Sequence, residues 1–135
     1  MREITIDAKV DNLHLVTEFL EELLEEHGCS MSFQLQLTVA VEEMFVNIAN
    51  YAYGNKEGKA VFKAEVLEDP KAVRVTFTDF GIPFDPLKKA DPDVTLPASM
   101  RAVGGLGIYM AKKNVDRMDY CYEDGKNILT MVKKI

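Results

Sequence analysis

Hydrophobic and polar residues follow two different periods along the first half of the chain. Residues 2–9 alternate between polar and apolar side chains, which predicts a β-strand. Residues 13–28 instead carry apolar side chains every three or four positions, which predicts an amphipathic helix that ends at Gly28. A second helix is predicted over residues 33–53, where apolar residues are denser and polar ones fewer.

The second half of the chain is predicted to form two β-hairpins, over residues 59–80 and 117–135. Asp, Pro and Lys at 69–71 mark the turn of the first hairpin, and Asp-Gly within 123–127 marks that of the second. Residues 81–105 lose this periodicity and hold four of the five prolines. An irregular segment of this length in a small domain is usually functional. A short helix is expected over residues 106–116, where glycines open an apolar run.

The resulting order is strand, helix, helix, two strands, loop, helix and two strands. Because the strands come in consecutive pairs and the helices do not alternate with them, this order predicts an α+β fold. We expect a two-layer α/β sandwich, in which helices cover one face of a mostly antiparallel sheet. The length of 135 residues suits one domain over residues 1–135.

Composition excludes several classes of protein. The formal net charge is −6 and there is no basic run, so direct binding to nucleic acid is not expected. No apolar run approaches the ~20 residues of a membrane span, and the N-terminus has no apolar core of signal-peptide length. Cys29 and Cys121 lack any metal-ligand spacing and are expected to be reduced thiols of a cytoplasmic protein.

The first motif with chemical potential is Glu43-x-x-x-Asn47 on the second helix. A spacing of four places both side chains on one face of the helix, and Asn50 and Tyr51 follow one turn later. A carboxylate there can accept a proton, and an amide oxygen can bind a hard cation such as Mg²⁺. Taken alone, the same pair would also suit a polar helix surface or a local hydrogen bond.

The second motif is "TDFGIPFDP", residues 78–86, at the end of a predicted strand. Asp79 can accept hydrogen bonds from the exocyclic amine of an adenine ring, and Gly81 would let a flat ring approach the backbone. Asp, Gly and Pro are also the residues of an ordinary β-turn. Asp79-Phe80-Gly81 matches the DFG tripeptide of eukaryotic kinases, but the HRD and VAIK motifs of those kinases are absent.

The third motif is "GGLGIYMA", residues 104–111. Glycines before a helix expose backbone N–H groups at its positive end, where a phosphate can bind. The pattern is neither GxGxxG nor a Walker A sequence, and a plain turn before a helix would explain it equally well.

The three motifs together are more specific than each one alone. Their order resembles the N, G1 and G2 boxes of the GHKL ATPases, which share the Bergerat nucleotide-binding fold, also called the histidine kinase-like ATPase fold. The chain looks most like the anti-sigma factors of this superfamily that are serine/threonine-protein kinases. This resemblance is carried by "VEEMFVNIANYAYG", "DFGIPFDP" and "GGLGIYMAKKNVDRMDYCYEDGKNILTMVKK" and covers essentially the whole chain.

The resemblance implies a role for particular residues. Glu43 would be the general base, or would orient the attacking hydroxyl, and Asn47 would hold Mg²⁺. Asp79 would bond the adenine amine of ATP, with Gly81 beside the ring. Residues 85–103 would form the lid over the nucleotide. Further nucleotide-binding positions are expected at Asn50, Arg101, Gly104, Gly105, Leu106, Gly107 and Thr130, with Lys88, Lys89 and Lys112 as weaker candidates for phosphate contacts.

The resemblance also implies a function. The chain would phosphorylate a Ser or Thr of a STAS-domain anti-anti-sigma factor, and would hold a sigma factor inactive as a homodimer. Tyr51 stands where these kinases often carry a histidine, and the lid has few hydroxyl or basic residues, so the efficiency of phosphoryl transfer stays open. The alternative is a nucleotide-binding module that sequesters partners with little or no kinase activity. A catalytic core of a larger GHKL machine and an α+β domain that binds no nucleotide are weaker alternatives.

Overall fold

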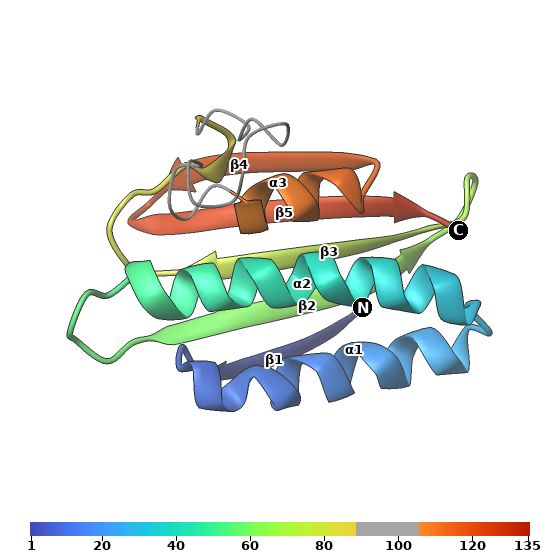
Figure 1. Cartoon of the computed structure of the whole chain (residues 1–135), viewed down its shortest axis with the longest axis horizontal. Helices are drawn as coiled ribbons and strands as arrows, with labels where there is room; N and C mark the ends of the chain where they lie inside the picture. The colour runs from blue at the N-terminus through green and yellow to red at the C-terminus, as the bar shows by residue number, and fades with distance from the viewer. Residues whose placement is uncertain (89–105) are drawn as a thin grey trace.

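The computed structural model describes residues 1–88 and 106–135 of the chain. Its centre is a five-stranded antiparallel sheet in the spatial order β1-β2-β3-β5-β4 (Figure 1). The strands are β1 (Arg2–Asp7), β2 (Lys59–Leu67), β3 (Ala72–Asp79), β4 (Arg117–Glu123) and β5 (Lys126–Lys134). The two predicted hairpins therefore lie side by side through β3 and β5, and the first strand adds to the edge formed by β2.

Three α-helices lie on one face of this sheet, which makes a two-layer α+β sandwich (Figure 1). They are α1 (Leu13–Glu26), α2 (Met31–Tyr51) and α3 (Leu106–Lys113), with short 3-10 turns at η1 (Val10–Asn12) and η2 (Pro86–Lys88). The Oγ of Ser30 accepts a hydrogen bond from the Phe33 N–H at 3.2 Å and caps α2. The predicted fold class is confirmed, and α2 occupies the middle position between α1 and α3.

A row of apolar side chains across the sheet anchors the helices. The register places Ile4, Phe62, Phe77, Leu129 and Tyr120 opposite one another on successive strands. The Phe62 and Phe77 rings lie 4.7 Å apart between centroids, and α2 contributes Phe45 at 6.2 Å from Phe77. Since Phe62 and Phe77 are fully buried, this row forms the centre of the core.

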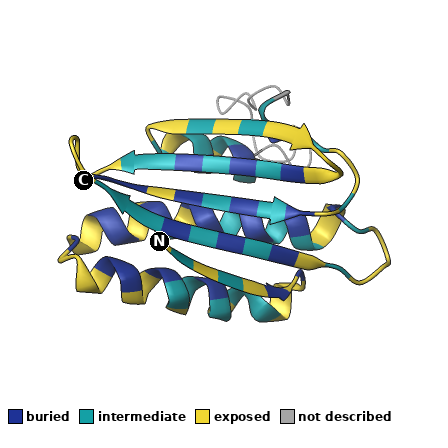
Figure 2. Cartoon of the chain, turned by 180° about the vertical axis from the view of Figure 1, so that it is seen from behind, coloured by how far each residue is buried: buried dark blue, intermediate teal, exposed yellow. Residues whose placement is uncertain are grey.

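The opposite face of the sheet is open, and burial alternates along its strands (Figure 2). In β5 the inward positions are Asn127, Leu129 and Met131, and the positions between them point away from the helices. Asp79 of β3 is paired with Asn127 of β5. Asp79 and Asn127 therefore lie two residues along their strands from the Phe77–Leu129 pair, on the face that the helices cover.

The turn of the second hairpin shows how local sequence sets this register. Asp124 and Gly125 both have positive φ, at 53° and 75°, and Glu123 pairs with Lys126. This is a two-residue hairpin loop in the left-handed region that Asp-Gly favours. The predicted turn therefore also determines which residues of β4 and β5 face inward.

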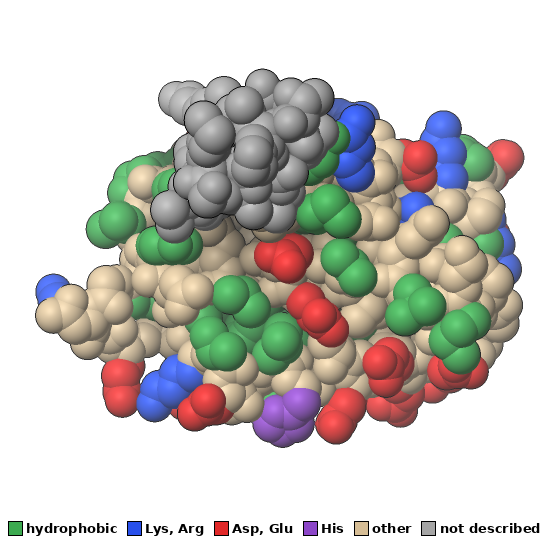
Figure 3. Space-filling view, viewed as in Figure 1, with side chains coloured by type: hydrophobic (Ala, Val, Ile, Leu, Met, Phe, Trp, Pro, Cys, Tyr) green, Lys and Arg blue, Asp and Glu red, His purple; other side chains and the backbone are tan. Residues whose placement is uncertain are grey.

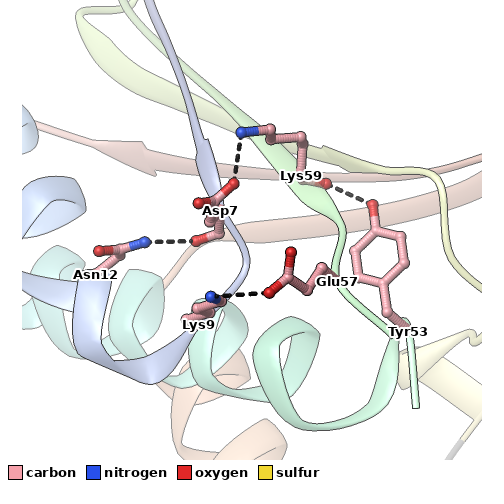
Figure 4. A network of polar contacts seen from close by, with 6 residues as sticks. All are labelled: Asp7, Lys9, Asn12, Tyr53, Glu57 and Lys59. Atoms are coloured by element: carbon pink, nitrogen blue, oxygen red, sulfur yellow. Dashed lines mark hydrogen bonds and ion pairs between the residues drawn. The ribbon is translucent and has the colours of Figure 1, made fainter. Parts of the chain in front are cut away.

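Polar contacts tie the loop after α2 to the first strand (Figure 4). The Tyr53 hydroxyl donates to the Lys59 carbonyl and accepts from the Phe80 N–H at 2.8 Å. Lys59 forms an ion pair with Asp7, which lowers the pKa of that carboxyl through a hydrogen bond and charge attraction. These contacts hold the end of α2 next to the end of β3, where the second motif begins.

Candidate functional site

Asp79 is buried at the end of β3, with 5% of its surface exposed. Its Oδ1 accepts hydrogen bonds from the Gly81 N–H at 3.0 Å and from Nδ2 of Asn127 at 2.9 Å. Its Oδ2 makes no hydrogen bond with a described residue. No fully buried side-chain nitrogen or oxygen in the described part of the chain lacks a partner, so Oδ2 is open to the neighbouring pocket. Burial raises the pKa of this carboxyl, while the bonds from Asn127 and Gly81 oppose that shift.

Asn127 is a central residue of the site that the sequence analysis missed. Its Nδ2 donates to Asp79 and to the Ile82 carbonyl at 2.8 Å, and its Oδ1 accepts from the Phe84 N–H at 3.1 Å and from the Tyr120 hydroxyl. All four hydrogen-bonding positions of the amide are therefore used. The amide fixes Asp79 and the segment that follows β3 at the same time. The Asp-Gly turn was the available signal, since its register places Asn127 on the same face as the apolar residues of β5.

Gly81 lies so close to the backbone of Ala52, at the C-terminal end of α2, that a side chain would not fit there. A Cβ at Gly81 would lie 2.1 Å from the Ala52 carbonyl oxygen, which in turn accepts the Ile82 N–H at 2.9 Å. Only glycine fits at this approach. The pocket next to Asp79 is lined by Asp79 and Ile82, and Gly81 is not among its lining residues. The position of Gly81 beside an adenine ring therefore stays a prediction.

The pocket beside Asp79 has apolar walls and a polar end. It lies between the C-terminal half of α2, the ends of β3 and β5, and the segment after β3. Its lining includes Met44, Ile48, Ala52, Phe77, Ile82, Phe84, Pro86 and Leu129 as apolar residues, with Asn47, Tyr51, Asp79, Tyr120 and Asn127 as polar ones. The rings of Tyr51 and Phe84 stack with centroids 6.4 Å apart and planes inclined by 27°. Such a lining suits a flat, largely apolar ring that carries one hydrogen-bond donor.

A second pocket adjoins the first and shares Asn47 and Tyr51 with it. Glu43, Val46, Asn50, Gly107 and Ile108 complete its lining. The side chains of Glu43, Asn47 and Asn50 make no hydrogen bond with another described residue. The helix motif and the start of α3, which are far apart in sequence, therefore meet in one cavity.

Glu43 lies directly against the first turn of α3. A Cβ at Gly107 would be 2.3 Å from Oε2 of Glu43, so the carboxylate occupies the space that any larger residue would need. The neighbouring Glu42 is half-buried, and its pKa is raised by burial and by repulsion from Glu43 and Glu21. Glu42 does not line this pocket, so Glu43 is the carboxylate among its described lining residues, and its charge favours a cation there.

Mg²⁺ matches the donors at this end of the site. Asn47 offers an amide oxygen, which is a hard ligand, and the negative charge of Glu43 lies in the same pocket. No cluster of three or more His, Cys, Asp or Glu that could hold a metal is present within residues 1–88 and 106–135. Few protein ligands are nonetheless enough for an ion that is bound mainly through phosphates and water, as Mg²⁺ commonly is.

Thr130 does not lie with the other predicted site residues. It pairs with Thr76 and lines a shallow hollow with Lys63, Glu65 and Arg74 on the open face of the sheet. The prediction placed Thr130 in the site by resemblance. Thr130 is three residues from Asn127, however, and successive side chains of a strand alternate between its two faces, so Thr130 points to the opposite face. This placement contradicts the expected position of Thr130 among the nucleotide-binding residues.

Several predicted residues lie outside the described part of the chain. These are Lys89, Arg101, Gly104, Gly105 and most of the predicted lid at 85–103. Leu106 begins α3, and Lys112 lies in its last turn. No helix in residues 1–88 and 106–135 is long and apolar enough to cross a membrane.

Curated proteins are similar to this chain over most of its length. The serine-protein kinase RsbW of Listeria monocytogenes serovar 1/2a is 26% identical over 131 residues, which cover 93% of this chain and 82% of the relative. The protein of the same name from Bacillus mycoides is 22% identical over 129 residues, covering 94% of this chain and 81% of the relative.

A solved structure has the same fold. The crystal structure of the RsbU and RsbW domains of Rv1364c from Mycobacterium tuberculosis superposes with a TM-score of 0.68 at 20% identity. The match covers 99% of this chain and 32% of that one, so this chain spans about a third of the larger protein. The family model for the histidine kinase-like ATPase domain matches residues 6–133, nearly the whole sequence. This chain therefore belongs to the histidine kinase-like ATPase domain family.

Proposed function

We propose that the chain is an ATP-dependent serine/threonine-protein kinase that also acts as an anti-sigma factor. The observation that carries this proposal is the pair of adjoining pockets that share Asn47 and Tyr51. One pocket ends at Asp79 and the other at Glu43 and Gly107. A nucleotide lying across both would have its base at the buried end and its phosphates at the acidic, more open end.

The buried end suits adenine. The free Oδ2 of Asp79 is an acceptor, so it would bind the exocyclic amine of adenine and would repel the carbonyl that guanine carries at the same position. Tyr51 and Phe84 would flank the ring. Because Asn127 and the Gly81 N–H already occupy Oδ1, the carboxylate is oriented before the base arrives.

The open end suits a triphosphate with Mg²⁺. Asn47 would hold the ion, which supplies positive charge to the phosphate oxygens when bound. The backbone N–H groups of Gly104, Gly105, Leu106 and Gly107 would contact the phosphates at the start of α3. Arg101 is the side chain proposed to add positive charge from the lid, and Asn50 lines the same pocket.

Glu43 is the proposed general base. Its carboxylate would take the proton of a Ser or Thr hydroxyl on the protein substrate. The hydroxyl oxygen would then bond to the γ-phosphorus as the bond between that phosphorus and the bridging oxygen of ADP breaks. The absence of hydrogen bonds from Glu43 to other described residues leaves the carboxylate available for this contact.

The proposed substrate is a STAS-domain anti-anti-sigma factor, and the proposed binding target is a sigma factor, with the kinase acting as a cytoplasmic homodimer. Support comes from the serine-protein kinase relatives, which align over most of both chains. Their identity of 22–26% supports the class of enzyme and leaves the particular partners to experiment.

A phosphoryl-transfer assay tests this function. Purified chain, labelled ATP, Mg²⁺ and a STAS-domain protein encoded near it in the genome would be incubated and resolved by gel. We expect label on the STAS protein, and none when its acceptor Ser or Thr is replaced by Ala. Normal ATP binding in calorimetry without any transfer would refute the kinase assignment.

The second candidate is a nucleotide-binding module that sequesters partners with little or no kinase activity. One observation favours it: the Glu43 carboxylate lies against the N-terminal turn of α3, where a negative charge stabilises a helix without any catalytic role. In that case a Glu43→Gln variant would retain every effect of the wild-type chain on the sigma factor in cells.

A further inference from the structure

Helix α2 is apolar on the side that faces away from the sheet as well as on its core side. Met31, Leu35 and Val39 lie four residues apart and are 67%, 61% and 37% exposed. Residues at this spacing lie along one face of a helix. Single exposed apolar residues are ordinary on a protein surface, but a continuous row of three on one helix is a feature of binding faces.

A groove runs between this row and α1. It is lined by Met31, Gln34, Leu35, Thr38, Glu21 and Glu25. Gln34 spans the groove floor, where its Nε2 donates to Glu25 at 3.2 Å and to the Cys29 carbonyl at 3.0 Å. The face therefore combines an apolar ridge with a neighbouring hollow, and Figure 3 shows apolar side chains and carboxylates side by side on this side of the molecule.

The charged side chains of α1 and α2 are all negative. No Lys or Arg occurs in the sequence between Lys9 and Lys56, a span that contains both helices and all of their glutamates. Within the described residues, Glu26 pairs with Arg2, whereas Glu21, Glu22 and Glu25 form no ion pair. On the open face of the sheet the charges neutralise one another in pairs: Lys63 with Glu3, Arg74 with Glu65, and Arg117 with Asp119.

We propose that Met31, Leu35 and Val39, with Glu21 and Glu25 beside them, form a docking face for a partner protein that presents a helix with an apolar stripe bordered by Lys or Arg. The groove between two helices accepts the side-chain ridge of a third helix. The unpaired glutamates select a basic partner and repel an acidic one. A second copy of this face, a nucleic acid and an anionic membrane are all disfavoured by the same negative charge.

The docking face shares no lining residue with either nucleotide pocket. Val39 lies one turn from Glu43, whereas Leu35, at the centre of the face, lies further from the site. Leu35 and Asn47 are twelve residues apart on α2, which corresponds to about 18 Å along the helix axis. The docking proposal therefore stands independently of the proposed kinase activity. A variant of Leu35 would leave the lining of both nucleotide pockets unchanged.

Binding of a designed peptide tests the proposal. The probe is a fluorescein-labelled helical peptide with Leu at positions i, i+4 and i+8 and Lys at the flanking positions, titrated with the full chain and followed by anisotropy. We expect saturable binding that Leu35→Asn weakens about tenfold and that the double variant Glu21→Gln, Glu25→Gln weakens several-fold with a smaller salt dependence. Tyr122→Asn and Glu123→Gln, exposed residues of the edge strand β4, are the matched controls and should leave the affinity unchanged.

Three results would overturn the proposal. The first is equal affinity of wild type and Leu35→Asn, and the second is equal binding of a peptide whose Lys residues are replaced by Glu. The third is a dimer of the free chain in sedimentation that Leu35→Asn dissociates, which would make a second copy the occupant. Circular dichroism and the Tm verify that Leu35→Asn is folded, and Met31→Gln repeats the measurement if it is not.

Discussion

The two ends of the candidate site differ in how their polar groups are satisfied. At the buried end, Asn127 uses all four of its hydrogen-bonding positions, and Asp79 retains one free oxygen. At the open end, Glu43, Asn47 and Asn50 line a pocket without a hydrogen bond to any other described residue. The buried end is thus organised by the protein itself, while the open end is left for groups that a ligand supplies. We expect substitutions at the buried end to change stability and base selectivity, and those at the open end to change chemistry and ion binding.

The largest effect is expected from Glu43→Gln. The amide has nearly the same shape but cannot accept the hydroxyl proton, so phosphoryl transfer should fall by about 10²–10⁴-fold. Affinity for ATP and the Tm should change little, because Glu43 makes no hydrogen bond with a described residue. Single-turnover transfer and calorimetry measure the two quantities. Undiminished phosphoryl transfer would show that the Glu43 carboxylate stabilises helix α3 and is not the general base.

The next effect is expected from Asn47→Ala, which removes the proposed Mg²⁺ ligand. Affinity for ATP in the presence of Mg²⁺ should fall about a hundredfold, while the free energy of unfolding should stay within about 1 kcal/mol of wild type. Asn55→Ala, an exposed turn residue, is the control. If Asn47→Ala instead unfolds the chain and the folded remainder still binds MgATP, then Asn47 has a structural role and the contrast between the two ends fails.

At the buried end, Asn127→Ala should act mainly on stability. It removes four hydrogen bonds and leaves the Ile82 carbonyl and the Phe84 N–H without their partner, which should cost about 2 kcal/mol in the free energy of unfolding. Thr130→Ala, three residues further along β5 on the open face, should cost less than about 0.5 kcal/mol. Urea denaturation compares the two. Equal losses would mean that the amide network contributes nothing beyond ordinary packing.

The Asp79→Asn substitution replaces one side-chain oxygen by an NH₂ group and should lower ATP affinity without lowering stability. Its side-chain oxygen can still accept from Gly81 and Asn127, but an NH₂ group replaces the free oxygen and cannot accept the adenine amine. ATP affinity should fall about tenfold to thirtyfold. The Tm of the nucleotide-free protein should stay the same or rise, since the substitution removes a buried charge. A lower Tm together with unchanged ATP affinity would reverse both expectations.

The pH dependence of Asp79→Asn should give the smallest effect. Burial raises the pKa of Asp79 in the folded protein above its unfolded value of 3.8, so the folded state holds this proton more tightly. Any stability advantage of Asp79→Asn should therefore be largest above the raised pKa. It should shrink as the pH falls through the raised pKa toward 3.8. Thermal melts of both proteins between these limits would test this, and an advantage that grows on acidification would contradict the assigned sign.

Much of the fold could be predicted because its signals are local. The period of two in β1, the period of three to four in α1 and the Asp-Gly turn all depend on residues within a few positions of one another. The same is true of Glu43 and Asn47, whose spacing places them on one side of α2 in any context. Thr130 was misplaced because the prediction assigned it to the site by resemblance, whereas the hairpin register assigns it to the open face.

The sequence by itself determined the order of the elements, the α+β class and the chemical type of the side chains available for a site. Only the tertiary structure decided which of them meet. The pairing of Asp79 with Asn127 depends on the register between strands that are 48 residues apart in sequence, and the approach of Glu43 to Gly107 depends on how α2 and α3 lie on the sheet. Contacts of this kind depend on packing across the whole domain, and no periodicity within a single segment encodes them.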